Sequence, residues 1–98
     1  MTREITRAEL QSKIDREEPF VLVEALPEPY YRKGHLPGAR LLPHDRVTEL
    51  AGALIPDRAT EVVVYCASAT CHNSHEAAAS LAGLGYSNVR VYAGGKAD

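Results

Sequence analysis

The chain has 98 residues, of which 45% are apolar and 24% are charged, and its formal net charge at pH 7 is −2. This length suits one domain with one core, and no apolar run approaches the roughly 20 residues that span a bilayer, so neither a second domain nor a membrane-embedded protein is expected. Because Lys and Arg form no cluster, neither nucleic acids nor membrane surfaces are expected as partners.

No targeting segment is expected at the amino terminus. Residues 1–7 carry charge without a following apolar stretch, unlike a secretory signal. The chain has two cysteines, and one short bridge between them would be an unusual disulfide framework for a secreted domain. We therefore expect a cytoplasmic protein, in which two neighbouring thiols suggest reactivity or metal binding.

The first predicted element is a helix that begins at Thr6 and ends near Glu17. Thr6 and Glu9 have the spacing of a capping box, in which each side chain accepts a hydrogen bond from the backbone N–H of the other residue. Leu10 and Ile14 are one helical turn apart and supply the apolar stripe of this helix.

Four apolar segments predict strands. Residues 20–23 are apolar throughout, and residues 61–65 give the strongest β signal because they contain three consecutive valines. Shorter strands are expected at residues 40–42 and 88–92. Continuous apolar runs are typical of strands buried on both faces of a parallel sheet.

Short helical turns are expected between the first strands. Residues 30–33 form one that ends at Gly34, and residues 46–50 form another that ends before Gly52. Pro37 and Gly38 have the sequence of a tight turn.

A longer helix is expected after the segment that contains the two cysteines, Cys66 and Cys71. Asn73 with Glu76 three positions later is an N-cap signature, so the helix is expected to open at Asn73. One face of this helix carries small and apolar residues, which let it lie close to a sheet: Ala77, Ala78, Leu81 and Ala82.

Strands that alternate with helices predict the α/β class. We expect a single domain over residues 1–98, with an open parallel β-sheet of four to five strands flanked by helices on both faces. Ligands of such sheets bind outside the carboxyl ends of the strands. The residues expected near those ends are Glu24, His35, Cys66, Gly94 and Gly95.

The segment after the valine strand is the candidate site. If residues 67–72 curl around Cys66, their backbone N–H groups form an anion-binding nest in line with the positive end of the following helix. Such a setting lowers the pKa of a cysteine thiol from about 8.5 towards or below neutrality. The expected binding residues are Ala67, Ser68, Ala69, Thr70, Cys71 and His72. Most of these residues are small, so the sulfur is expected to be uncovered.

Several motifs, in this order, resemble the rhodanese family. They are Gly-His-Leu-Pro-Gly-Ala at residues 34–39, Val-Val-Val-Tyr-Cys at 62–66, Leu-Gly-Tyr at 84–86, Asn-Val at 88–89 and Gly-Gly at 94–95. The resemblance implies a rhodanese-like fold and a sulfurtransferase without a cofactor. It also implies that Cys66 takes up sulfane sulfur as a persulfide and passes it to a thiol or another nucleophilic acceptor. The implied partners are a small sulfur donor and a thiol acceptor, with a protein donor or acceptor as an alternative.

The catalytic loop departs from that family pattern. Residues 66–74 contain no arginine and are about two residues longer than the common rhodanese loop, which leaves His72 and His75 as the nearest potential cations. A persulfide or protein donor is therefore as plausible as thiosulfate. Rhodanese-like phosphatases and arsenate reductases clamp their oxyanions with a late arginine, so its absence argues against both activities.

Other departures lie outside the loop. Glu24 stands where the family usually has Asp, while Leu26 and Tyr30 stand where it commonly has an Arg and Glu that pair. Both members of that pair are missing together, so no buried charge is expected to remain unpaired. Family members usually continue after the Gly-Gly motif into a final helix, and without it apolar surface is expected beside the first helix.

Alternatives remain open for the polar residues around the loop. Cys71 is a candidate resolving thiol that would make the domain a redox module through a reversible disulfide with Cys66, or else a small packing residue. The Cys and His spacing is not a standard zinc pattern, so no metal is predicted. His35 is expected to hold its turn by hydrogen bonding, and Gly94–Gly95 is either a pocket edge or a turn that needs positive φ. The last alternative is a non-catalytic interaction domain.

Overall fold

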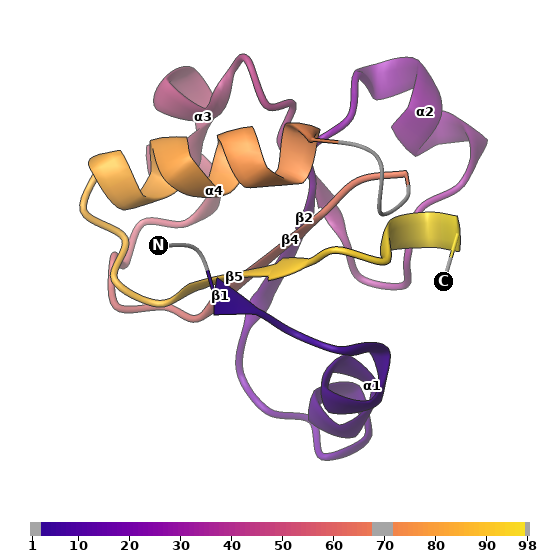
Figure 1. Cartoon of the computed structure of the whole chain (residues 1–98). Coiled ribbons are helices and arrows are strands. Elements are labelled where there is room, and N and C mark those ends of the chain that lie inside the picture. Colours follow the sequence, from indigo (N-terminus) through magenta and orange to yellow (C-terminus); the bar gives the residue numbers. More distant parts are fainter. Residues whose placement is uncertain (1–2, 68–71, 98) are drawn as a thin grey trace.

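The protein folds around a parallel sheet, as the sequence predicts. The structure is a computed structural model that describes residues 3–67 and 72–97. Its described strands form one five-stranded parallel sheet in the order β1-β5-β4-β2-β3 (Figure 1). The strands are β1 (Arg3–Glu4), β2 (Val21–Glu24), β3 (Arg40–Leu41), β4 (Val62–Tyr65) and β5 (Val89–Tyr92). The sequence pattern missed β1, because both its residues are polar and exposed.

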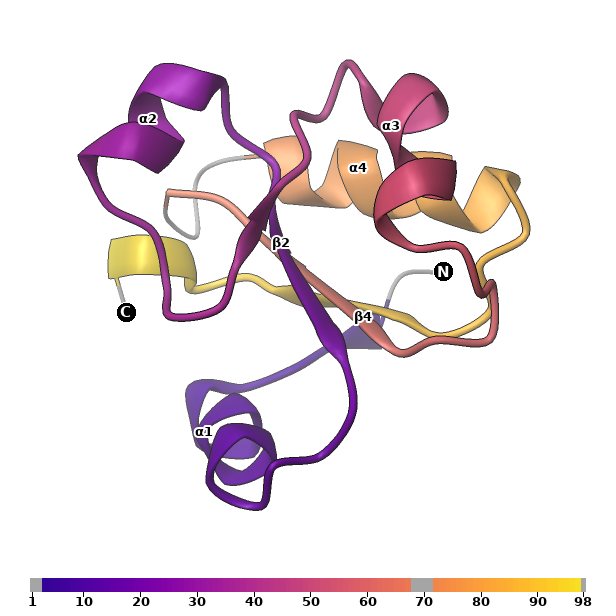
Figure 2. The ribbon, with the colours of Figure 1, turned by 180° about the vertical axis from the view of Figure 1, so that it is seen from behind.

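Helices cover both faces of this sheet, which confirms the predicted layering. Helix α1 lies alone on one face, and α3 and α4 lie together on the other (Figures 1 and 2). The helices are α1 (Arg7–Asp15), α2 (Glu28–Lys33), α3 (Val47–Leu54), α4 (Asn73–Gly83) and the short 3-10 turn η1 (Gly95–Ala97). Strand β1 pairs with β5 alone, so the first and last strands lie side by side.

The two cores follow from the alternation of side chains along the strands. Successive residues of a strand point to opposite faces, so Val62 and Val64 pack towards α3 and α4, whereas Val63 and Tyr65 pack towards α1. All four residues of β4 are fully buried. The three consecutive valines therefore mark a central strand with two covered faces, as predicted.

Two helices end at other residues than the sequence suggested. Helix α1 ends at Asp15, before Glu17, which takes a left-handed φ of 55°. Ile14 is 41% exposed and is not part of a buried stripe with Leu10. Helix α3 continues through Gly52 to Leu54, because Val47 and Ala51 pack into the core and their burial outweighs the low helix propensity of one glycine.

Helix α4 begins at Asn73, as predicted, but the prediction that Asn73 is its N-cap residue is wrong. The N-cap residue is His72, whose side chain makes no capping hydrogen bond. The Glu76 carboxylate lies 3.4 Å from the Nε2 atom of His44 and does not reach back to the N-terminus. The buried stripe begins at Ser74, so Ala82 falls about 90° from its centre and is exposed.

The capping box of α1 is present as predicted. The Thr6 hydroxyl accepts a hydrogen bond from the Glu9 N–H at 3.1 Å, and the Glu9 carboxylate accepts one from the Thr6 N–H at 3.0 Å. The N–H of Thr6 and the neighbouring Arg90 guanidinium lower the pKa of Glu9.

Thr6→Ala should destabilise the protein by about 1 kcal/mol, because it removes an acceptor for a helix N–H that has no partner within the helix. Urea denaturation should show a lower midpoint with an unchanged slope. Thr48→Ala is the control, since Thr48 is exposed in α3 and its replacement should change stability by less than about 0.5 kcal/mol. Equal effects of the two substitutions would contradict the role of the cap.

Candidate functional site

The candidate site lies where the order of strands reverses. From β2 the chain passes to β3 on one side of β2, and then returns to β4 on the other side. Connections that leave in opposite directions open a crevice at the carboxyl ends of two neighbouring strands. Glu24 and Tyr65 are paired at the ends of β2 and β4, and Cys66 follows directly.

Cys66 is held at the end of the central strand. Its carbonyl oxygen accepts a hydrogen bond from the Lys96 N–H at 3.0 Å. Its thiol donates to the Ser74 hydroxyl at 3.5 Å, and the two residues are each 1% exposed. The expectation of an uncovered sulfur is therefore wrong, because Ser74 turns inward from α4 and packs against it.

The described part of the loop is only its two ends. Ala67 is exposed after Cys66, and His72 is exposed at the start of α4. The other predicted binding residues lie outside the described residues: Ser68, Ala69, Thr70 and Cys71. Ser74, which no sequence motif marks as a site residue, lies in α4 and contacts the sulfur. No sequence signal distinguishes it from the other small residues of that helix.

The position of Ser74 places the Cys66 sulfur beside the N-terminus of α4. The first turn of a helix has N–H groups without partners within the helix and a partial positive charge of about half an elementary charge. Helix α4 has 11 residues, and the side chain of its N-cap residue His72 makes no capping hydrogen bond, so it does not compete for these N–H groups. This end of the helix favours a negatively charged sulfur or a bound anion.

A buried carboxylate lies beside this strand end. Glu24, which was expected at the pocket edge, is 0% exposed. Its Oε1 atom accepts a hydrogen bond from the Tyr65 hydroxyl at 2.8 Å and lies 3.0 Å from the Nζ atom of Lys96. Its Oε2 atom has no hydrogen-bond partner among the described residues.

Sequence reasoning missed Lys96 as the partner of Glu24. An acidic residue at the end of an apolar strand indicates that a counter-charge is needed. The chain has 11 lysines and arginines, however, and no spacing rule selects one that lies so far along the sequence. At the two positions where the family commonly has an Arg–Glu pair, Leu26 is buried and Tyr30 is exposed.

The Gly34–His35 turn is tied to the same strand end. The Leu36 N–H donates to the Tyr65 hydroxyl at 3.0 Å. His35 is exposed and stacks on Tyr31 with ring centroids 3.9 Å apart, and its Nδ1 atom lies 3.1 Å from the Tyr31 carbonyl oxygen. This is the hydrogen-bonding role expected of His35.

The Gly94–Gly95 segment turns the chain towards the site. Gly94 is half-buried, and Gly95 is buried with a φ of 62°, a conformation that favours glycine. Gly95 therefore forms the turn with positive φ that was one of the two interpretations of this motif. It also places Lys96 where its N–H reaches Cys66.

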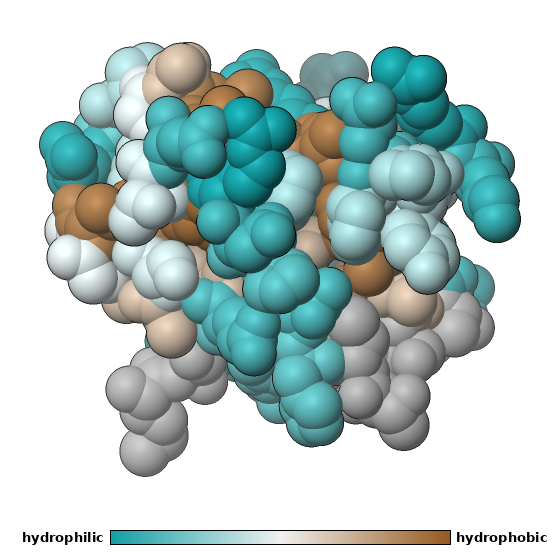
Figure 3. Space-filling view, turned by 90° about the horizontal axis from the view of Figure 1, so that it is seen from above, coloured by the Kyte–Doolittle hydropathy of each residue, from teal (hydrophilic) through white to brown (hydrophobic). Residues whose placement is uncertain are grey.

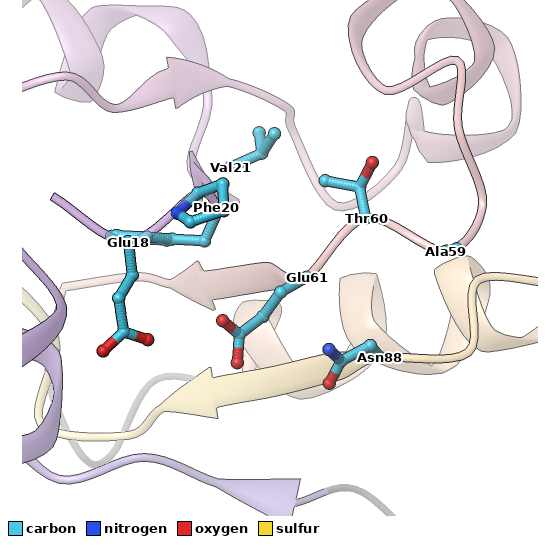
Figure 4. Close-up of a pocket in the computed structure, with 8 residues that line it drawn as sticks. Glu18, Phe20, Val21, Ala59, Thr60, Glu61 and Asn88 are labelled. Carbon is cyan, nitrogen blue, oxygen red and sulfur yellow. The ribbon is translucent and has the colours of Figure 1, made fainter.

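A broad cavity at the other end of the sheet is not part of this site. It has a volume of about 650 Å³ and lies at the amino ends of β2, β4 and β5 (Figure 4). Its two carboxylates, Glu18 and Glu61, are both bound by Lys13, at 3.2 and 2.5 Å. Its lining residues are Glu18, Pro19, Phe20, Val21, Ala59, Thr60, Glu61 and Asn88.

An apolar groove lies beside α1, where apolar surface was predicted. It has a volume of about 230 Å³ and is lined by residues of α1, the Pro37 turn and β5, with Ile14 on its wall. The face over α2, α3 and α4 is mostly hydrophilic, with small separate hydrophobic areas (Figure 3).

No group of three or more His, Cys, Asp or Glu residues that could hold a metal ion occurs within residues 3–67 and 72–97. Over the same ranges, no helix has the length and apolar character needed to cross a bilayer.

Comparison with known proteins identifies the class of this domain. A family model described as a rhodanese-like domain matches residues 6–98, so the chain belongs to the rhodanese-like domain family. No curated protein sequence matches the chain significantly.

Solved structures give the same fold. A rhodanese with anions from E. coli is 29% identical, with a TM-score of 0.70 over 80% of this chain and 88% of that one. The BH2092 protein from Bacillus halodurans is 25% identical, with a TM-score of 0.86 over 96% of this chain and 68% of that one. The human single-domain sulfurtransferase TSTD1 is 23% identical, with a TM-score of 0.83 over 99% and 94%.

Burial, followed by the hydrogen bond to Glu24, raises the pKa of the Tyr65 phenol far above its usual value. An unfolded chain therefore loses this proton first, near pH 10, and the contribution of Tyr65 to stability falls as the pH rises further. In the native state, Tyr65→Phe should leave the tyrosinate absorbance gained between about pH 9 and 11 unchanged. In denaturant, the variant should lose the signal of one tyrosine. A smaller native signal in the variant would show that Tyr65 titrates normally.

Proposed function

We propose that this protein is a sulfurtransferase in which Cys66 is the nucleophile and the carrier of sulfane sulfur. One observation carries the proposal: Cys66 directly follows the central strand, and its sulfur lies 3.5 Å from the Ser74 hydroxyl oxygen in the first turn of α4, within a rhodanese-like domain. The E. coli rhodanese of 29% identity was solved with anions, which supports an anionic donor.

Sulfur transfer would take place in two steps, neither of which needs a bound cofactor. First, the Cys66 thiolate attacks the outer sulfur of the donor, and the S–S bond of the donor breaks. The leaving group is sulfite when the donor is thiosulfate, and it is a thiolate when the donor is a persulfide. Second, an acceptor thiolate attacks the outer sulfur of the Cys66 persulfide, which regenerates the Cys66 thiolate and yields a persulfide on the acceptor.

Three groups would stabilise the negative sulfur in both steps. The Ser74 hydroxyl accepts from the thiol in the described structure and would rotate to donate to a thiolate. The N-terminus of α4 adds its partial positive charge. We assign the remaining donors to backbone N–H groups of residues 67–72.

The donor is expected to be a persulfide or a protein carrier as readily as thiosulfate. Residues 66–74 contain no arginine to clamp the sulfonate of thiosulfate, and the nearest ring nitrogens belong to His72 and His75. His72 is exposed and His75 half-buried, so a donor would meet both at the rim. The acceptor is expected to be a thiol, small or on a protein.

Access to the sulfur needs a movement of the site. Cys66 is 1% exposed, so the terminal sulfur of a donor reaches it only after Cys66 or its neighbours shift. We propose that this shift precedes the attack of the thiolate on the donor.

Intact mass after incubation with thiosulfate, or separately with a low-molecular-weight persulfide, tests the carrier. The protein should gain one sulfur atom, about 32 Da, with at least one donor, and Cys66→Ser should abolish the gain. Cys71→Ser is the matched control and should keep it. A loss of about 2 Da that needs both cysteines would instead indicate a disulfide switch. No change with any donor would indicate an interaction domain.

Ser74→Ala should slow the reaction of Cys66 with iodoacetamide at pH 7 by roughly three- to tenfold, because the thiolate loses one hydrogen bond to a charged acceptor. Ser80→Ala is the control, since Ser80 lies farther along α4 and its replacement should leave the rate unchanged. Equal rates for wild type and Ser74→Ala would remove Ser74 from the mechanism.

A further inference from the structure

We propose that Lys96 is a positioning residue for Cys66, which it holds through its backbone while its side chain is anchored on Glu24. The proposal rests on the proposed role of Cys66 as nucleophile. Lys96 makes no described contact with the sulfur and would act through the Cys66 backbone.

The backbone contact fixes the peptide that follows the nucleophile. The Lys96 N–H donates to the Cys66 carbonyl oxygen at 3.0 Å. Cys66 lies one residue beyond β4, where the hydrogen bonds of the sheet end: the Tyr65 carbonyl still accepts from the Ala25 N–H of the neighbouring chain segment. Lys96 therefore supplies a hydrogen bond beyond the end of the strand, at the residue whose sulfur direction matters.

The side chain of Lys96 anchors that contact at two points. Its Nζ atom lies 3.0 Å from Glu24 Oε1 and donates to the Tyr30 carbonyl oxygen at 3.0 Å. Both views show η1 beside α2 at the same end of the molecule (Figures 1 and 2). One residue thus joins the ends of β2 and β4 to α2.

The anchor is strong because its carboxylate is fully buried. Glu24 is 0% exposed and Lys96 only 24%, so water screens the pair weakly. Tyr65 donates to the same Glu24 oxygen, which limits the directions from which Lys96 approaches. Among the described residues, Lys96 is the cation in ion-pair contact with Glu24.

The consequence for chemistry is a fixed orientation of the sulfur. Rotation of the peptide after Cys66 would alter where Sγ points relative to Ser74 and the first turn of α4. Small displacements of a reacting group, on the order of 1 Å, reduce rates by up to about a hundredfold. Loss of the ion pair between Lys96 and Glu24 should therefore lower kcat more than it weakens donor binding.

The experiment compares Lys96→Met, Lys96→Arg and the double variant Glu24→Gln/Lys96→Met, with Lys33→Met of the exposed end of α2 as control. For each, the readouts are thermal unfolding, the iodoacetamide rate of Cys66, and kcat and KM for sulfur transfer. Lys96→Met should lower the alkylation rate and kcat by about tenfold and change KM by less than about twofold. Lys96→Arg should stay within about threefold of wild type, because a guanidinium also pairs with Glu24.

The double variant separates positioning from stability. It leaves no buried carboxylate without a counter-charge, so it should regain much of the thermal stability that Lys96→Met loses, yet its rates should stay low. The proposal is overturned if Lys96→Met keeps wild-type rates, or if the double variant regains rate together with stability. If wild type transfers no sulfur from any donor, the proposed function fails, and the alkylation rates alone decide the positioning role.

Discussion

The burial of β4 on both faces is the constraint on which the rest of the structure depends. Its four residues have no exposed side, so one helix layer must cover Val63 and Tyr65 and another must cover Val62 and Val64. The chain must therefore cross the sheet repeatedly. The connections that follow β2 and β4 run in opposite directions along the sheet, to β3 and to β5. The same constraint brings Cys66 to the crevice between β2 and β4, where a helix N-terminus and a buried ion pair meet.

Most of the fold could be predicted because its signals are local. The valines of β4, the Thr6–Glu9 box and the Pro37–Gly38 turn each report a backbone preference within a few residues. The errors arose where tertiary packing outweighs such preferences. Gly52 stays helical because its neighbours are in the core, and the two polar residues of β1 are held by pairing with β5.

The site was less predictable than the fold, because its contacts span the chain. Cys66 was identifiable from its place after a strand. Its contact with Ser74, however, depends on which face of α4 is turned towards the sheet. The partner of Glu24 is Lys96. These two residues lie so far apart in the sequence that no helical or strand periodicity relates them. Physical reasoning from sequence can state that a buried carboxylate needs a cation, whereas only the folded chain selects which one.

The pairing of β1 with β5 also governs how this domain is completed during synthesis. Residues 3 and 4 leave the ribosome before their hydrogen-bonding partners, residues 90 and 91. Contacts between such distant residues form late, because a long loop must close before they are made. Strand β1 thus has no pairing partner until β5 has been synthesised, so α1, which follows β1, remains without its full docking surface until then.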